Sequence, residues 1–236
     1  MFTDRNRVLL IIPAYNEEKS IEAVVDELRE DYPELDYVVV TDGSTDGTPE
    51  LCRNKGYNTI ELPINLGLAG CFQTGMKYAR REGYSYAVQF DGDGQHRPEY
   101  INAMKEKMEE GYDIVLGSRF IGLENKMGGM RSIGSKLIAL SVRLTTGKSV
   151  TDPTCGLRMY NRSMIEDFAE NLNYAPEPDT ISFLIKNGAK VAEVPVKVRE
   201  RTEGESYLKP LNAAKYMLRM LISILVIQNF RKSQKQ

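Results

Sequence analysis

The stretch "VLLIIPAYNEEKSIEAVVDEL", residues 8–28, contains a change of hydrophobic period that decides the fold class. It begins with a continuous apolar run, which is typical of a strand buried on both faces of a parallel sheet. After the polar turn "PAYNEE", apolar residues recur at positions i, i+3, i+4 and i+7, namely Ile21, Val24, Val25 and Leu28. This spacing places them on one face of a helix. The stretch therefore predicts a strand, a turn and an amphipathic helix.

The strand–helix pattern recurs along the first half of the chain. Apolar runs predict further strands at residues 37–40, 58–61, 86–90 and 113–118, with helices between them. This alternation predicts an α/β fold with a mostly parallel, doubly wound sheet. Beyond about Phe120 we expect helices at 132–146 and 178–187, and a strand-like run at 189–201 that Pro195 places at an edge or a bend. No linker divides residues 1–208, so we expect one domain followed by a C-terminal helix at 209–236.

Composition sets limits on the class of protein. The chain has 236 residues, 42% of them hydrophobic and 27% charged, which is ordinary for a globular protein. A net charge of -2 gives no whole-chain argument for nucleic-acid binding. The cysteines are scattered (Cys52, Cys71 and Cys155), which favours a reducing compartment. The apolar run before Pro13 is too short for a signal peptide, and no segment reaches the roughly 18 uncharged apolar residues of a spanning helix. We therefore expect a cytoplasmic protein that binds no nucleic acid.

Polar clusters follow several of the predicted strands: "PAYNEE", "TDGSTDGT", "DGDGQH" and "GSR". In doubly wound sheets, ligands bind beyond the carboxyl ends of the strands, so these clusters should converge on one crevice. Asp91 and Asp93 belong to a tight turn or to a metal–phosphate site, in which two carboxylates hold a divalent cation that binds substrate phosphates. A calcium loop of the EF-hand type is excluded, because His96 and Asn102 stand where glycine and glutamate are needed. The position at a strand end favours the metal–phosphate site.

Several other residues are candidates for the site, and some of them have two possible roles. Asp42 caps the following helix or accepts the N–H of a nucleobase. Tyr15 stacks on that base or packs in the ordinary way. His96, the only histidine, acts as a general base or, as we favour, as a partner of the acidic loop. Met127 and Met130 are expected to be contact residues in a loop.

Seven motifs occur in order: "IIPAYNEEKSI", "VVVTDGSTDGT", "NLGLAG", "VQFDGDGQHRPEYI", "DIVLGSRF", "DPTCGLRMY" and "VPVKVRERTEGESYL". Together they resemble the family 2 glycosyltransferases of the GT-A fold, and more narrowly the dolichyl- and undecaprenyl-phosphate sugar synthases. The resemblance extends from Val8 to about Leu208. Two positions depart from the family pattern, because Thr41 replaces an aspartate and Glu205 replaces a lysine that follows a glycine.

The resemblance implies a role for individual residues. The nucleotide pocket would comprise Pro13, Ala14, Tyr15, Glu17, Asp42 and Asp91, with Asp42 reading the base. The ligands of Mg²⁺ or Mn²⁺ would be Asp91, Asp93 and Gln95. The arginines facing phosphate groups would be Arg119, Arg131, Arg199 and Arg201. The residues closest to the chemistry would be Asp93, Arg131, Asp152 and Asp179.

The resemblance also implies the reaction, an inverting transfer of a sugar from a nucleotide-sugar, with UDP-sugars favoured. A saccharide hydroxyl as acceptor would need a general base, for which Asp179 and Glu177 are candidates. A polyprenyl phosphate is already nucleophilic at neutral pH, because its second pKa lies near 6. Asp152 in "DPTCG" and the position of Arg131 favour the lipid phosphate. A catalytically silent nucleotide-sugar-binding protein is an alternative, whereas a dinucleotide-binding oxidoreductase is disfavoured, because no glycine fingerprint follows the first strand.

The C-terminal segment 211–230 is apolar on most faces, and no acidic residue follows Glu205. It is a helix packed on the domain or on a second subunit, or a helix lying in an anionic membrane surface. A polyprenyl-phosphate acceptor favours the membrane surface. We therefore expect peripheral attachment at the inner face of the cell membrane, with a small membrane protein as a possible partner and a homo-oligomer as a possible assembly.

Overall fold

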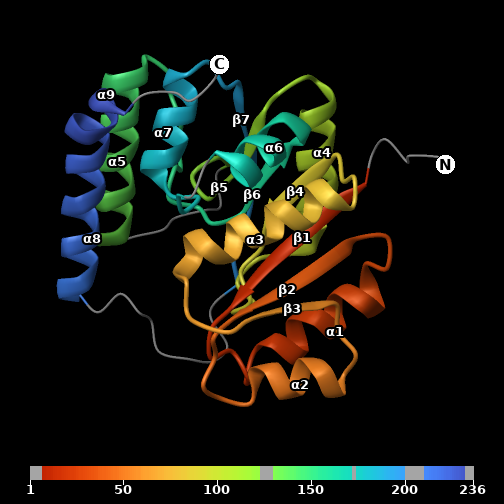
Figure 1. Cartoon of the computed structure of the whole chain (residues 1–236). Coiled ribbons are helices and arrows are strands. Elements are labelled where there is room, and N and C mark those ends of the chain that lie inside the picture. The colour runs from red at the N-terminus through yellow and green to blue at the C-terminus, as the bar shows by residue number, and fades with distance from the viewer. Residues whose placement is uncertain (1–6, 123–129, 172–173, 200–209, 232–236) are drawn as a thin grey trace.

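A seven-stranded sheet forms the centre of the molecule in the computed structural model (Figure 1). The structure describes residues 7–122, 130–171, 174–199 and 210–231. The strand order is β3-β2-β1-β4-β6-β5-β7. The strands are β1 (Val8–Ala14), β2 (Asp36–Asp42), β3 (Thr59–Leu62), β4 (Tyr86–Gln89), β5 (Ile114–Ser118), β6 (Arg158–Asn161) and β7 (Val191–Pro195).

Helices cover both faces of this sheet. They are α1 (Ile21–Asp31), α2 (Thr48–Asn54), α3 (Gly67–Arg81), α4 (Ile101–Glu109), α5 (Met130–Thr146), α6 (Arg162–Glu170) and α7 (Pro178–Lys186). The chain then continues into α8 (Pro210–Ile222), a π-helical turn (Ser223–Ile227) and α9 (Gln228–Phe230). The predicted α/β class with a mostly parallel sheet is confirmed.

Strand β1 shows why the first apolar run is continuous. Leu9 and Ile11 point into a core shared with α3 and α6, whereas Leu10 and Ile12 point into a core shared with α1 and α4. All four side chains are fully buried. A strand covered on both faces has no exposed position for a polar residue, so its sequence shows no alternation.

Strand β6 is the only described strand that runs against the others. It pairs antiparallel with both β4 and β5, whereas β1, β2, β3 and β4 pair in parallel, as do β5 and β7. The amino end of β6 therefore lies at the same edge of the sheet as the carboxyl ends of its neighbours. This brings the preceding loop, residues 151–156, to the edge where the polar clusters were expected.

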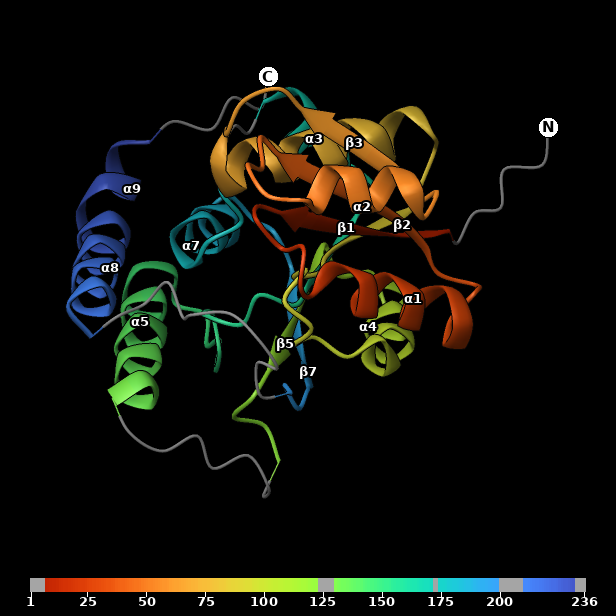
Figure 2. The same ribbon diagram turned by 90° about the horizontal axis from the view of Figure 1, so that it is seen from below.

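The C-terminal segment packs on the domain. Met220 and Ile224 are fully buried and belong to the core that α5 and α7 also enter. Figures 1 and 2 show α5 and α8 side by side at one end of the molecule. Among the described residues, no helix is both long enough and apolar enough to span a bilayer. One of the two predicted roles of this segment, packing on the domain, is thus present in the structure.

Candidate active site

The loops that follow β1 and β2 are joined by hydrogen bonds. The side-chain oxygen Oδ1 of Asn16 accepts from the backbone N–H of Thr45 at 2.8 Å, and the N–H of Glu17 donates to Oγ1 of Thr48 at 2.9 Å. Asn16 has a φ of 56°, in the left-handed region that asparagine tolerates better than most residues. The first two predicted clusters therefore form one surface, on which the Tyr15 ring is exposed whereas Pro13 is half-buried and Ala14 is buried.

Asp42 lies at the end of β2 and binds the start of α3. Its Oδ1 accepts from the N–H of Leu66 at 2.6 Å, and its Oδ2 accepts from the N–H of Gly67 at 2.8 Å. The neighbouring Gly43 makes this approach possible, because it has a φ of +61° and an added Cβ would lie 2.6 Å from the backbone N of Asn65. Asp42 thus acts as a cap, although on α3 rather than on the next helix in the chain. Each carboxylate oxygen retains a further lone pair with which to accept another hydrogen bond.

The Asp91 side chain, 38% exposed, is held by His96. The N–H of Asp91 donates to Nδ1 of His96 at 3.0 Å, and Nε2 of His96 lies 3.5 Å from Oδ2 of Asp91. Because Nδ1 accepts, the neutral ring carries its proton on Nε2, which faces the carboxylate. Gly156 covers the other side, since an added Cβ there would lie 2.8 Å from Oδ2 of Asp91 and 3.1 Å from Cε1 of His96. Two parts of the chain therefore fix this carboxylate.

The Asp93 side chain is buried, and its Oδ1 accepts from the N–H of Gln95 at 3.0 Å. Gln95 in turn binds the segment after β7. Its backbone oxygen accepts from the N–H of Arg199 at 2.9 Å, and its Nε2 donates to the oxygen of Arg199 at 3.3 Å. The guanidinium of Arg199 donates to both carboxylate oxygens of Glu27 on α1. The predicted phosphate ligand Arg199 is therefore engaged in an ion pair in this structure.

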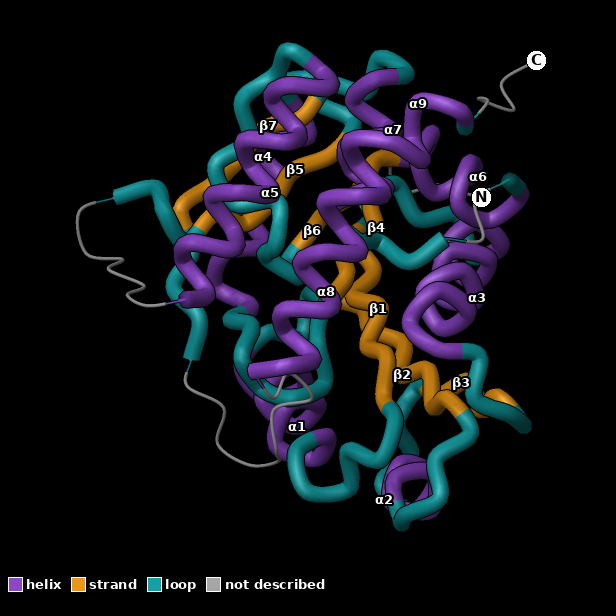
Figure 3. Tube along the Cα trace, turned by 90° about the vertical axis from the view of Figure 1, so that its left-hand side faces the viewer, coloured by secondary structure: helices purple, strands orange, loops and turns teal. Residues whose placement is uncertain are grey.

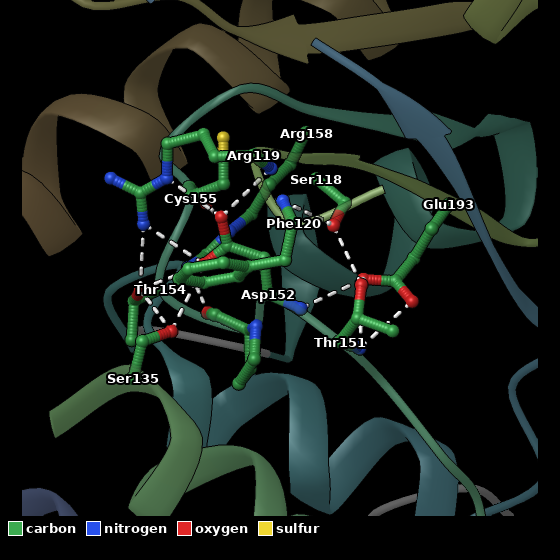
Figure 4. A network of polar contacts seen from close by, with 11 residues as sticks. Ser118, Arg119, Phe120, Ser135, Thr151, Asp152, Thr154, Cys155, Arg158 and Glu193 are labelled. Atoms are coloured by element: carbon green, nitrogen blue, oxygen red, sulfur yellow. Dashed lines mark hydrogen bonds and ion pairs between the residues drawn. The ribbon is translucent and has the colours of Figure 1, made fainter. Parts of the chain in front are cut away.

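Asp152 and Arg119 form a buried ion pair (Figure 4). Nε of Arg119 donates to Oδ2 of Asp152 at 2.6 Å, and Nη2 donates to Oδ1 at 2.9 Å. Thr154 and Ser135, from the same loop and from α5, also donate to Asp152. Burial works to raise the pKa of Asp152, but the hydrogen bonds and the charge of Arg119 outweigh it and leave the pKa below its ordinary value. The Asp152 side chain is 0% exposed, so it positions Arg119 and does not itself face a substrate.

The amino end of α7 carries the two candidate bases. Oδ2 of Asp179 accepts from Oγ of Ser223 at 2.7 Å and from Nε2 of Gln228 at 3.4 Å, so this carboxylate binds the C-terminal helical segment. Burial, followed by the charge of Asp179, raises the pKa of Glu177 above its ordinary value. A raised pKa is a common property of carboxyl groups that exchange protons in catalysis. Of the two candidates, Glu177 has the environment that suits a base better.

Some contacts of the site were not identified from the sequence. His96 was predicted to be a partner of the acidic loop, but the close approach of Gly156 to His96 and Asp91 was not predicted, because only the fold brings these residues together. Arg158 is buried and donates to the backbone oxygens of Cys155 and Pro153, so it shapes the loop before β6. Met127, Arg201 and Glu205 lie outside the described residues, and the side chains of Met130 and Arg131 are likewise outside the description.

The model of glycosyl transferase family 2 matches residues 9–168. Over 226 residues the chain is 29% identical to the polyprenol monophosphomannose synthase of Mycolicibacterium smegmatis, covering 91% of this chain and 85% of the relative. It is 32% identical over 211 residues to the undecaprenyl-phosphate mannosyltransferase of Micrococcus luteus, covering 85% and 86%. These matches confirm the resemblance that the motifs indicated.

The structure is also similar to glucosyl-3-phosphoglycerate synthase from Mycobacterium tuberculosis, solved with Mn²⁺, UDP-glucose and phosphoglyceric acid. The TM-score is 0.71 at 20% identity, and the match covers 97% of this chain and 82% of the other. At this identity the likeness shows the fold alone. The family model, however, covers more than half of the sequence. The chain therefore belongs to glycosyl transferase family 2, and the protein is a glycosyltransferase of the GT-A fold.

Proposed function

We propose that the protein transfers a sugar, with inversion, from a nucleotide-sugar to a polyprenyl phosphate, that it depends on Mg²⁺ or Mn²⁺, and that UDP-sugars are its favoured donors. The observation that carries this proposal is the pair Asp91 and Asp93, which follows β4 at the edge of the sheet where ligands are expected, with Asp91 in contact with His96. The curated relatives named above support the acceptor class, since both names specify a polyprenyl-type lipid.

The donor atoms of the site fit a hard divalent cation. Asp91, Asp93 and the amide of Gln95 offer oxygen ligands, which suit Mg²⁺ and Mn²⁺. Within the described ranges, no group of three or more His, Cys, Asp or Glu side chains gathers to hold a metal ion. A site with few protein ligands is typical of a cation that is also held by water and by substrate phosphates. When bound, the cation would stabilise the negative charge that develops on the leaving diphosphate.

The hydrogen bond that Asp179 accepts from Ser223 supports a phosphate acceptor, because it engages one of the two candidate bases. A phosphate oxygen needs no base at neutral pH. Arg119 donates to Asp152 from both its backbone N–H and its guanidinium. These hydrogen bonds fix the charge of Arg119 near the loop before β6. We propose that Arg131 and Arg201 supply further phosphate contacts. The alternative is transfer to a saccharide hydroxyl, for which Glu177 would be the base.

An acceptor assay distinguishes these two functions. The purified full-length protein is given Mn²⁺, one uridine or one guanosine sugar donor, and either undecaprenyl phosphate or a soluble oligosaccharide. We expect a glycosylated lipid phosphate of inverted anomeric configuration, with a Glu177→Gln variant retaining most of the wild-type rate. Products that form only on the oligosaccharide, together with loss of activity in Glu177→Gln, would establish the alternative. Absence of turnover with every donor, despite nucleotide binding, would indicate a catalytically silent protein.

The contact between His96 and Asp91 predicts that substitutions of His96 change the affinity for Mn²⁺. A His96→Asn variant keeps an acceptor close to the position of Nδ1, whereas His96→Gln places its amide near the position of Nε2. Because the 3.0 Å bond from the Asp91 N–H is made to Nδ1, we expect Asn to preserve Mn²⁺ affinity better than Gln. The Gln and Ala variants should bind Mn²⁺ roughly 10- to 100-fold more weakly, the usual effect of losing a residue that orients a metal ligand. Electron paramagnetic resonance of free Mn²⁺ measures this directly, and wild-type affinity in His96→Ala would refute the role.

A further inference from the structure

Helix α5 exposes a stripe of large apolar side chains to solvent. Its members are Ile133, Leu137, Leu140 and Leu144, which are between 47% and 71% exposed. Their spacing of four, three and four residues places them on one face of the helix. The opposite face is buried, since Ile138 and Val142 belong to the core. Packing among the described residues therefore leaves this stripe without a cover.

The C-terminal helical segment exposes a second stripe. Its members are Leu218, Ile222, Leu225 and Val226, which are between 43% and 60% exposed. Here too the opposite face enters the core, through Met220 and Ile224. The apolar side chains on the outside of this segment are therefore not needed to attach it to the domain.

The two stripes belong to one surface, which we name the α5–α8 face. The helices touch at Gly134, where an added Cβ would lie 2.8 Å from Cε of Met217. Figure 3 views the molecule from this side and shows α8 beside α5, with the sheet behind them. Soluble monomers rarely expose a continuous apolar surface of more than a few hundred Å², and larger ones mark interaction sites.

The charged side chains that α5 and α8 expose have a single sign. Within the described part of the two helices, the exposed charged side chains are Lys136, Arg143, Lys215 and Arg219. The sequence itself contains no aspartate or glutamate from residue 130 to 146 or from 206 to 236. An apolar surface whose own helices expose only cations complements an anionic lipid interface, in which acyl chains take up the apolar groups and headgroups pair with the cations. A second copy of the same face would bring like charges together.

We propose that the α5–α8 face docks the enzyme on an anionic bilayer, with α5 contributing as much as the C-terminal segment. This inference rests on the proposed lipid-phosphate acceptor and extends it by assigning the surface that meets the membrane. Helix α5 also connects that surface to the site, because its buried Ser135 donates to Asp152 at 3.2 Å. A phosphate headgroup at the bilayer surface would therefore lie beside the loop that holds Arg119.

The main test uses substitutions on α5, in the full-length protein. The variant Leu137→Gln/Leu140→Gln/Leu144→Gln replaces exposed side chains, and circular dichroism checks its fold. In co-sedimentation with vesicles of phosphatidylglycerol and phosphatidylcholine, we expect at least tenfold weaker binding than wild type. A charge variant, Arg143→Gln/Arg219→Gln, should weaken binding to these vesicles, whereas the matched pair Lys77→Gln/Arg81→Gln on α3 should not. Wild type should bind vesicles of phosphatidylcholine alone weakly.

The outcomes separate the surface from the function. Wild-type vesicle binding by the triple variant would overturn the proposed surface, as would sedimentation velocity showing that the substitutions convert a dimer to a monomer. Transfer to a short-chain, water-soluble prenyl phosphate should be unchanged in the triple variant. If wild type binds vesicles through this face but glycosylates no prenyl phosphate, the proposed function fails and the docking surface stands.

Discussion

Replacing Asp93 with asparagine is expected to lower the rate of sugar transfer by roughly 100- to 1,000-fold or more, the usual effect of removing one electrostatic group that acts on the transition state. Asparagine has the same shape and keeps an oxygen that accepts from the N–H of Gln95. The variant therefore removes the negative charge of a residue that is only 7% exposed, and keeps the hydrogen bond that holds the loop at Gln95. The rate is measured at saturating donor and Mn²⁺, and the unfolding temperature is measured alongside it.

The matched control for this prediction is Asp46→Asn. Asp46 is also a loop carboxylate, but it accepts from the N–H and the hydroxyl of Thr48 at the start of α2. The Asp46→Asn variant should retain most of the wild-type rate of sugar transfer. An Asp93→Asn enzyme with near wild-type turnover would contradict the assignment of Asp93 to the metal site. A large loss of thermal stability in that variant would instead mean that Asp93 is structural.

The largest effect on stability is expected from Asp152→Ala. This change leaves the guanidinium of Arg119 buried without its counter-charge, which costs about 3–5 kcal/mol for pairs of this kind. In a chain of this length the unfolding temperature should fall by roughly 6–20 °C. Glu61→Ala, which breaks an exposed pair with Arg53, should cost about 0–1 kcal/mol. Urea unfolding and calorimetry measure both, and an Asp152→Ala protein as stable as Glu61→Ala would contradict the account.

The same ion pair predicts how stability depends on pH. The pKa of Asp152 is lowered in the folded state. The contribution of its ionised form to the free energy of unfolding is therefore fully present above the ordinary carboxyl pKa of about 4. It is lost as the pH falls below that value toward the pKa of the folded state. A double variant Arg119→Met/Asp152→Leu replaces the pair with apolar groups of similar size and should recover much of the lost stability, with weaker acid sensitivity.

The sequence predicts the sheet well wherever a strand is long and apolar, as in β1 and β2, because a buried strand leaves a continuous run. Strand β6 was missed, since its four residues begin with the buried Arg158 and show neither alternation nor an apolar run. Helix α6, which follows it, was missed with it. The position of the loop that carries Asp152 and Gly156 was also not predicted, because it depends on the antiparallel direction of β6.

The rule that ligands bind beyond strand ends predicts the location of the candidate site, but it does not predict the contacts within it. Arg119 and Asp152 are 33 residues apart, and Arg199 and Glu27 are 172 residues apart. Residue type shows that these groups are charged. Only the fold determines which of them form ion pairs with one another and which remain available to bind a ligand. The role of His96 was predicted as a partner of the acidic loop, and its contacts with Asp91 agree with that prediction.

The central claim is that the loop with Asp91 and Asp93 binds a divalent cation that holds the diphosphate of the donor. The most direct test is calorimetric titration of metal-stripped wild-type protein with a nucleoside diphosphate, with and without Mn²⁺. We predict at least tenfold tighter binding in the presence of Mn²⁺, and loss of this enhancement in Asp93→Asn. Equal affinity with and without Mn²⁺ in the wild-type protein would contradict the claim.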